Sequence, residues 1–308
     1  MSLKNLFNKR LLFVSGKGGV GKTTVSVLLA LLGAKLKKKT LLVEMNAAGR
    51  IAPVFKCDSI GHDEVALAPY LSGINLLPKR CFEEYVLSQV RFKKIYELFF
   101  DNKYVTNFIR AVPGLNELLM LGKIYDLEKR FKSRVMGKKE YDLIIVDAPA
   151  TGHGLSALEV PKVVMDAVTV GPLHTHAKHI LELLANKEKT AFCMVTLAEE
   201  MPVCEAKEYS RAIKYRTEMG FGPLFVNAIM EKPEKLKAMG SLKNDLIIFK
   251  DYYDLANKRH QLNATYKKEI EHLFGGFSKV FLPYQFKGVS EQKDFNKLVQ
   301  QLIGDVRD

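Results

Sequence analysis

Short apolar runs alternate with longer amphipathic stretches along most of this chain of 308 residues. The runs are continuous rather than alternating, as in Leu143–Val146, which is typical of strands buried on both faces of a sheet. Strands separated by helices predict right-handed βαβ units. We therefore expect an α/β fold with a doubly wound, mostly parallel sheet of about 7–8 strands. The expected strands cover residues 11–15, 40–45, 74–77, 142–148, 191–197, 223–229 and 279–284.

Residues 83–138 interrupt this alternation with helical patterns. Broad apolar faces predict helices over 83–100, 104–112 and 115–135, and a second helical stretch covers about 156–189. The sequence thus predicts a single domain in which a helical subdomain is inserted into an α/β core. The core is expected to cover about 1–56, 72–80, 140–155 and 190–308, and the subdomain about 81–139 and 156–189.

The net charge of +13 is concentrated in two segments. Residues 1–43 contain nine basic residues and no acidic one, and residues 129–139 contain six more without an acid, which leaves the remainder close to neutral. This pattern indicates two local regions that attract anions. Cluster 129–139 has two interpretations: a surface for anionic lipid or a partner, or simply a solvated helix end.

Several classes of protein are excluded by what the sequence lacks. No apolar run approaches the ~18 residues of a membrane-spanning helix, and the apolar run 11–14 is too short for a signal peptide. We therefore expect a cytoplasmic protein with no stable membrane insertion. Four widely spaced cysteines without a CxxC pair predict reduced thiols and no zinc site. No nucleic-acid motif is present.

The strongest motif follows the first expected strand and precedes a helix predicted over 23–37. It satisfies G-x-x-x-x-G-K-[ST], in which glycines let backbone N–H groups converge on phosphate oxygens at a helix N-terminus. We expect Lys22 to neutralise the β- and γ-phosphates of ATP and the Thr23 hydroxyl to bind Mg²⁺. The candidate ligands of ATP or ADP are Gly16, Lys17, Gly18, Gly19, Val20, Gly21, Lys22, Thr23 and Thr24.

Two other expected strands end in polar side chains, at the edge where parallel sheets bind ligands. Residues 141–147 form an apolar strand that ends in Asp147, the Walker B pattern, and this carboxylate is expected to hold Mg²⁺ through water. Glu44 and Asn46 lie two residues apart and face the same side of their strand. Glu44 is a further candidate metal ligand, and Asn46 a candidate for orienting the attacking water.

These motifs together resemble those of the arsenite-pump-type (anion-transporting) ATPases and the related targeting ATPases for tail-anchored membrane proteins. The resemblance is carried by the K-G-G-x-G-K-T form of the phosphate loop, by the switch II segment 147–154 with its Thr-Gly-His core, and by segments 113–117, 195–206, 226–227 and 282–288. It implies a P-loop NTPase fold of the bacterial single-domain kind and a dimer, formed with an identical chain or a paralogue.

The resemblance also implies roles for particular residues and for partners. Lys17 corresponds to the signature lysine of the deviant Walker A class, which reaches the phosphates of the partner subunit, so Lys17, Asn46 and Asp147 are the candidate catalytic residues. Asn227 and Pro283 correspond to the adenine site. The helical subdomain is expected to change with nucleotide state and to serve a client protein or a membrane-pump partner.

Some positions depart from the family pattern. Asn46 stands where members usually carry Asp, and segment 46–53 lacks both acids and the histidine of switch I. Asn46 therefore either slows hydrolysis or marks a subunit that mainly binds nucleotide. No cysteine follows Cys204, so the zinc-binding CxxC of eukaryotic-like members is absent, and the arsenite-binding cysteines have no match.

Further segments allow more than one interpretation. Histidines 174, 176 and 179 suggest either a metal site or a partly exposed polar helix, and the aromatic stretch 91–100 either a client groove or subdomain core. The leading hypothesis is an ATPase that drives dimer rearrangement, and the alternative is a poorly hydrolysing partner of a paralogous ATPase. A membrane-surface scaffold needs an amphipathic C-terminal helix, but 295–306 has no basic flank, so we expect little membrane binding there.

Overall fold

The computed structural model describes residues 1–47, 49–89, 114–133, 137–149, 151–233 and 243–307. Within this part of the chain, eight strands form one sheet in the order β10-β9-β8-β1-β7-β2-β4-β3. All neighbouring strands are parallel except β3, which pairs antiparallel with β4 at the edge. The strands are β1 (Leu11–Gly16), β2 (Thr40–Met45), β3 (Val65–Ala68), β4 (Leu71–Leu76), β7 (Leu143–Asp147), β8 (Thr190–Leu197), β9 (Phe221–Ile229) and β10 (Lys279–Pro283).

This sheet confirms the predicted α/β class and the seven expected strands. Strand β3 was not expected, because its apolar run is only four residues long and lies partly exposed at the sheet edge. The order of strands shows a doubly wound sheet. From β1 the chain builds β2, β3 and β4 on one side, returns to place β7 between β1 and β2, and then adds β8, β9 and β10 on the other side. The carboxyl ends of β1, β7 and β2 consequently lie side by side.

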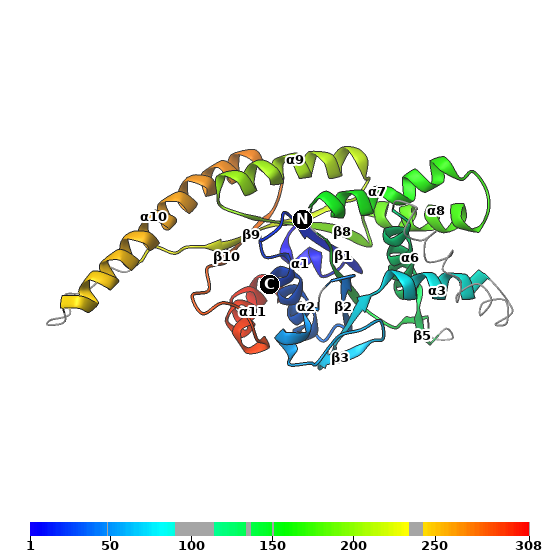
Figure 1. Cartoon of the computed structure of the whole chain (residues 1–308), viewed down its shortest axis with the longest axis horizontal. Helices are drawn as coiled ribbons and strands as arrows, with labels where there is room; N and C mark the ends of the chain where they lie inside the picture. Colours follow the sequence, from blue (N-terminus) through cyan, green and yellow to red (C-terminus); the bar gives the residue numbers. More distant parts are fainter. Residues whose placement is uncertain (48, 90–113, 134–136, 150, 234–242, 308) are drawn as a thin grey trace.

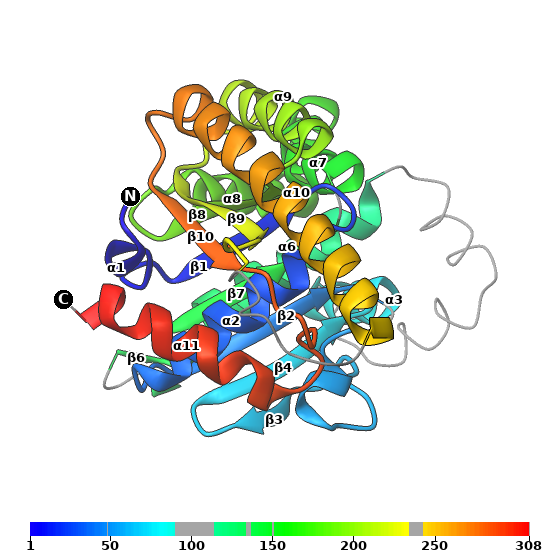
Figure 2. The same cartoon turned by 90° about the vertical axis from the view of Figure 1, so that its left-hand side faces the viewer.

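Helices cover both faces of the sheet, as Figures 1 and 2 show. Residues Leu11 and Phe13 of β1 belong to one apolar cluster, and Leu12 and Val14 belong to the other, as expected for a strand buried on both sides. One face carries α1 (Leu3–Leu6), α2 (Lys22–Lys35) and α11 (Gln292–Arg307). The other carries α6 (Leu115–Lys129), α7 (Thr151–Ala167), α8 (Pro172–Ala185), α9 (Glu200–Arg216) and α10 (Lys243–Leu273), and α3 (Pro78–Gln89) packs on α6.

Helix α11 is amphipathic, and its apolar face is part of the core. Phe295, Leu298 and Leu302 are buried in the same cluster as α2. This helix therefore has no free apolar face for a bilayer, which counts against the membrane-scaffold alternative. Among the described residues, no helix is both long and apolar enough to cross a membrane.

The expected helix over 115–135 is wrong beyond residue 129. Helix α6 ends at Lys129, Arg130 is extended, and β5 (Phe131–Ser133) pairs with β6 (Lys138–Lys139) in a two-stranded hairpin. Arg130 leaves the helix because its guanidinium makes two hydrogen bonds, of 2.6 and 2.8 Å, to the Glu64 carboxylate. The apolar periodicity could not reveal this distant partner.

The other helical stretches differ in extent from expectation. The stretch over 156–189 is two helices, because Gly171 has a left-handed φ of 105° at the start of α8. Helix α7 begins earlier than expected, at Thr151. The predicted helix 83–100 corresponds to α3 as far as Gln89. Its remainder, with the aromatic stretch 91–100 and the predicted helix 104–112, lies outside the described residues.

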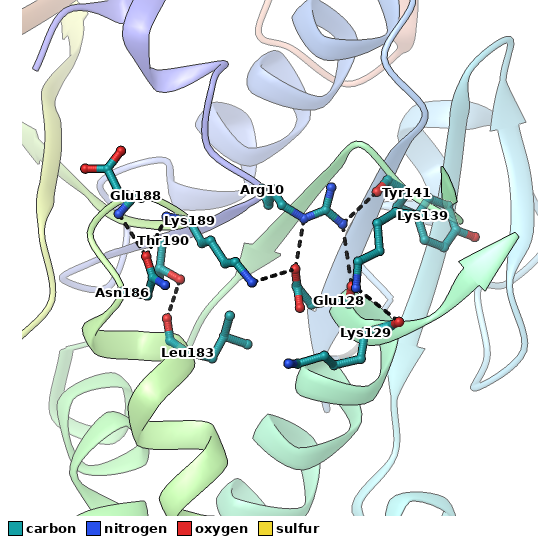
Figure 3. A network of polar contacts seen from close by, with 10 residues as sticks. All are labelled: Arg10, Glu128, Lys129, Lys139, Tyr141, Leu183, Asn186, Glu188, Lys189 and Thr190. Carbon is teal, nitrogen blue, oxygen red and sulfur yellow. Dashed lines mark hydrogen bonds and ion pairs between the residues drawn. The ribbon is translucent and has the colours of Figure 1, made fainter. Parts of the chain in front are cut away.

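A buried carboxylate ties α6 to the amino ends of the central strands (Figure 3). Glu128 is fully buried, and its Oε1 atom accepts a 2.9 Å hydrogen bond from Arg10 and lies 3.8 Å from the Lys189 ammonium. Arg10 also donates to the carbonyl oxygen of Tyr141 at 3.0 Å. The start of β1, the start of β8 and the end of α6 are thus joined through one acid.

We expect Glu128→Ala to lower the free energy of unfolding by about 3 kcal/mol, because two cations would lose the carboxylate that compensates their partial burial. Denaturation in urea measures this change. The exposed pair of Glu159 and Arg216 is the control, and Glu159→Ala should cost less than about 1 kcal/mol. Equal losses in the two variants would contradict the role given to the buried network.

Candidate functional site

The phosphate loop, residues 17–21, connects the end of β1 to the first turn of α2, as its motif predicts. Close packing fixes its glycines. A Cβ at Gly16 would lie 2.3 Å from the carbonyl oxygen of Val195, and one at Gly21 would lie 2.1 Å from Nδ2 of Asn227. Gly21 also has a left-handed φ of 93°. The position of Gly16 therefore requires glycine for space, and that of Gly21 requires it for both space and backbone conformation.

Asn227 lies at the carboxyl end of β9 and holds the loop. Its Nδ2 atom donates a 3.0 Å hydrogen bond to the carbonyl oxygen of Val20. Pro283 ends the neighbouring strand β10 and pairs in register with Ile229. The structure thus brings both predicted adenine-site residues to the sheet edge that carries the loop, and their contact with adenine stays a prediction.

Asp147 at the end of β7 lies against the first turns of α2. Its two carboxylate oxygens accept hydrogen bonds from the hydroxyls of Thr23, at 2.7 Å, and Ser26, at 3.0 Å. Burial raises the pKa of Asp147, and these hydrogen bonds partly offset that shift. The predicted pair of Thr23 and Asp147 is therefore in direct contact.

Glu44 stands beside Asp147, since the two residues are partners in the register of β2 and β7. The Glu44 side chain is fully buried, and its Oε1 atom accepts hydrogen bonds from the backbone N–H groups of Arg50 (3.0 Å) and Ile51 (3.3 Å). Its Oε2 atom is also buried, with no hydrogen-bond partner among the described residues. Burial and the nearby Asp147 charge raise the pKa of Glu44.

This set of groups suits a small hard cation. A hydroxyl and two adjacent carboxylates offer only oxygen ligands, which Mg²⁺ prefers. The unpartnered Glu44 oxygen and the raised pKa values of both acids indicate a place where positive charge would be stabilising. Thr23, Asp147 and Glu44 therefore fit the ion that the sequence predicted.

The two lysines of the loop point to different places. Lys22 is half-buried, its ammonium donates a 3.0 Å hydrogen bond to the Lys17 carbonyl oxygen, and burial lowers its pKa while Asp147 opposes that shift. Lys17 is exposed, and its ammonium lies 2.7 Å from the Glu205 carboxylate on α9. Lys17 is thus turned away from its own loop.

Asn46 follows β2 in a left-handed conformation, with φ of 49° and an exposed side chain. The spacing predicted that Asn46 and Glu44 share one side of the strand. Asn46 nevertheless lies outside the buried environment of Glu44, because the strand ends at Met45. The next residue is anchored by Asn75 on β4. The Asn75 side chain accepts from the Ala47 N–H at 3.3 Å and donates to the Ala47 carbonyl oxygen at 2.9 Å.

The start of the switch II segment is anchored to β1 and α9. The Ala148 N–H donates to the Val14 carbonyl oxygen at 3.0 Å. The Ser15 hydroxyl donates to the Pro149 carbonyl oxygen and pairs with the Tyr209 hydroxyl, both at 3.1 Å. The chain then enters α7 at Thr151, and the side chains of 151–153 lie outside the described part.

Three residues of this site were missed from the sequence. Ser26 lies one helical turn after Thr23, so its face could have been deduced from the spacing. Arg50 carries a positive charge that affects the pKa values of Lys22, Glu44 and Asp147. Neither Arg50 nor Asn75 belongs to a recognisable pattern, because only the pairing of β2 with β4 and the turn after β2 bring them to the site.

The histidines of α8 have a packing role in the structure. His176 and His179 do share a face, as their spacing predicted, and both rings contact Tyr125. His176 also covers Gly122, where a Cβ would lie 2.1 Å from its Nε2 atom, and burial lowers its pKa. Among the described residues, no three His, Cys, Asp or Glu side chains are arranged to hold a metal ion.

A glycine-rich loop between a buried strand and a helix, with an aspartate at the end of the neighbouring strand, defines the class of P-loop nucleotide-binding proteins. Within that class, the family of anion-transporting ATPases matches residues 9–171 and 169–304. The chain belongs to this family, as its motifs predicted.

Individual relatives agree with this assignment. ATPase BagA of Mycobacterium tuberculosis is 31% identical over 71% of this chain, and that match covers 64% of its own length. A protein of Aquifex aeolicus named for the arsenical pump-driving ATPases is 27% identical over 94% of this chain and 99% of its own length. ATPase GET3 of Malassezia globosa is 27% identical over 62% of this chain and 57% of its own length.

The environment of Glu44 makes stability depend on pH in the absence of Mg²⁺. Because its pKa is raised in the folded chain, ionisation of Glu44 costs stability as the pH rises above about 4.5, its ordinary value. Glu44→Gln cannot ionise. The free energy of unfolding of this variant, relative to the parent chain, should therefore increase from pH ~4.5 upward until the raised pKa is passed.

Urea denaturation at a series of pH values measures this difference. Mg²⁺ should reduce it, since the ion stabilises the ionised carboxylate of the parent chain only. A difference that is the same at every pH would contradict the assigned environment of Glu44.

Proposed function

We propose that this protein is a Mg²⁺-dependent ATPase that works as a dimer, and that nucleotide-driven rearrangement of the dimer acts on a client protein or a membrane-pump partner. The family assignment gives the ATPase activity in general. The dimer, the rearrangement and the partner are the finer proposal. The position of Lys17 is the single observation that carries it.

Lys17 belongs to the phosphate loop by sequence, but its ammonium is paired with Glu205 rather than directed into the loop. Lys22 already provides the inward cation, close to Asp147. An outward lysine at this position suits contact with a nucleotide held by a second chain across a common face. The Lys17–Glu205 pair is exposed, so it is weak enough to exchange for phosphate when two chains meet.

The residues of the site have distinct roles in the proposed reaction. Lys22, the backbone N–H groups of the loop and the N-terminus of α2 would hold the phosphates, and Asn227 keeps the loop in shape. Thr23, Asp147 and Glu44 would hold Mg²⁺, which supplies charge stabilisation to the transferring phosphoryl group. Asn46 is exposed at the same edge and would orient water through its amide.

Two anchored segments connect this site to the helices. Asn75 fixes the chain after Asn46 to β4, and Ser15 with Tyr209 fixes the chain after Asp147 to α9. Phosphate binding would displace these short segments. The segment after Asp147 leads directly into α7. The nucleotide state would thus reach the helices on that face, where we place the client or the pump partner.

A second candidate function is a nucleotide-binding subunit that hydrolyses ATP poorly and works with a paralogous ATPase. The amide of Asn46 supports it, because an amide cannot accept a proton from water as a carboxylate can. The same residue thus separates the two proposals. Its left-handed conformation is compatible with Asp as well as Asn.

The Glu205→Gln variant tests the role of Lys17. Loss of the ion pair should free Lys17 and strengthen ATP-dependent dimerisation by up to about five-fold, which corresponds to the free-energy contribution of one exposed ion pair. Lys17→Ala should instead abolish ATP-dependent dimerisation, and analytical ultracentrifugation with Mg²⁺-ATP measures both. Glu208→Gln, on the same helix and exposed, is the control. A chain that stays monomeric with ATP in every variant, although it still binds ATP, would refute the dimer.

The Asn46→Asp variant distinguishes the two candidate functions. If the parent chain is limited by its amide, the carboxylate should raise the rate of phosphate release by about ten-fold or more. Asn8→Asp, at an exposed site far from β2, makes the same chemical change as a control. An unchanged rate in Asn46→Asp would remove the proposed role of this position.

A further inference from the structure

A hairpin formed by residues 129–133 and 137–139, the basic hairpin, follows α6 on the side of the sheet opposite the phosphate loop. Its neighbours are the amino ends of β1, β7 and β8, whereas the phosphate loop follows the carboxyl end of β1. Figure 2 shows β6 at the periphery of the molecule, on the side of both chain ends and away from α3. This segment has no part in the nucleotide site.

The base of the basic hairpin is held firmly. Arg10 donates to the carbonyl oxygens of Glu128 and Tyr141, which lie immediately before and shortly after the hairpin (Figure 3). Inside the hairpin, the Lys139 ammonium donates to the Lys129 carbonyl oxygen at 3.1 Å. The Arg130 guanidinium is bound by Glu64. Because the base is fixed, binding through the other side chains of the hairpin would cost little additional backbone entropy.

The lysines presented by this base lack direct ion pairs among the described residues. None of Lys129, Lys132, Lys138 and Lys139 forms an ion pair with a carboxylate of the described part of the chain. Lys39, at the start of β2, adds a fifth ammonium, and the neighbouring Lys132 lowers the pKa of Lys39. Like charges held this close repel one another, so an anionic partner would relieve the repulsion.

An aromatic ring lies among these lysines. Phe131 is 41% exposed, and the Lys139 ammonium lies 4.1 Å from the centre of its ring. A cavity of about 320 Å³ opens beside it, lined by Lys123, Asp126, Leu127, Lys129, Arg130 and Phe131. Cations beside an exposed ring suit a membrane interface, where headgroup phosphates lie above the first acyl carbons.

We propose that the basic hairpin binds peripherally to membranes that contain anionic lipids. Lysine ammonium groups give strong attraction with little demand on geometry, which suits a fluid layer of headgroups. Single-stranded nucleic acid would call for several stacking rings, whereas the described part of the hairpin offers one. Contact through this face leaves the phosphate loop, on the opposite edge of the sheet, open to nucleotide and to a second chain.

Co-sedimentation of the full chain with vesicles tests this proposal. Vesicles of phosphatidylcholine with about one third phosphatidylglycerol should bind the protein, and pure phosphatidylcholine should bind it far more weakly. Binding should decrease steeply with salt, since a higher ionic strength screens exposed charges. Equal binding to the two kinds of vesicle, or no binding to either at low salt, would overturn the proposal.

The double variant Lys132→Glu/Lys138→Glu identifies the face that binds. Each lysine near an anionic surface contributes about five-fold in affinity, so the variant should bind at least about twenty-fold more weakly. Lys258→Glu/Lys268→Glu makes the same change of net charge on exposed positions of α10 and should retain most of the binding. Thermal denaturation and ATP binding check that both variants are folded. Equal losses in the two variants would overturn the assignment to the hairpin.

Competition distinguishes lipid from the other anionic partners. Polyglutamate and single-stranded RNA are added to vesicle-bound protein at equal total negative charge. Lipid vesicles should remain the preferred ligand. If either polymer displaces the protein, and binds directly to the parent chain but not to Lys132→Glu/Lys138→Glu, the hairpin is a site for that polymer and the lipid proposal fails.

Discussion

The contact of Asp147 with the hydroxyls of Thr23 and Ser26 is the interaction on which the site depends. It joins the end of β7 to the first turns of α2, and these two elements carry the predicted Walker B acid and the phosphate loop. The register of β7 and β2 then brings Glu44 beside the same carboxylate. One sheet edge therefore concentrates oxygen ligands and the cation of Lys22, which is the arrangement that a nucleotide with Mg²⁺ requires.

This arrangement disfavours the ionised forms of the two acids. Burial raises the pKa values of Glu44 and Asp147, and one Glu44 oxygen has no partner among the described groups. By our proposal, a bound cation would stabilise both carboxylates, and ligand binding would thereby be coupled to the positions of the flanking segments. Asn75 and the Ser15–Tyr209 pair hold the two flanking segments by a few hydrogen bonds, few enough to be rearranged by bound phosphate.

At the opposite edge of the sheet, charged residues form a buried network and an exposed surface. There the buried Glu128 compensates Arg10 and Lys189, and the basic hairpin extends from this base with its lysines exposed. The chain thus divides its positive charge between two edges with different tasks. At the loop, by our proposal, lysines serve phosphates inside the site and across a dimer. At the hairpin, lysines form an open surface that is suited to a layer of anions.

The sequence by itself determined seven of the eight strands of the main sheet, among them the Asp147 strand, together with the phosphate loop and the family, because each depends on residues close together in the chain. The apolar runs identify strands, and the glycine spacing identifies the loop. Only the tertiary structure decided the rest. Arg130 ends α6 because of the distant Glu64, Lys17 turns to Glu205 on α9, and Asn75 on β4 reaches Ala47 after the adjacent strand β2. Such partners are set by strand order and helix packing, and local sequence patterns do not record them.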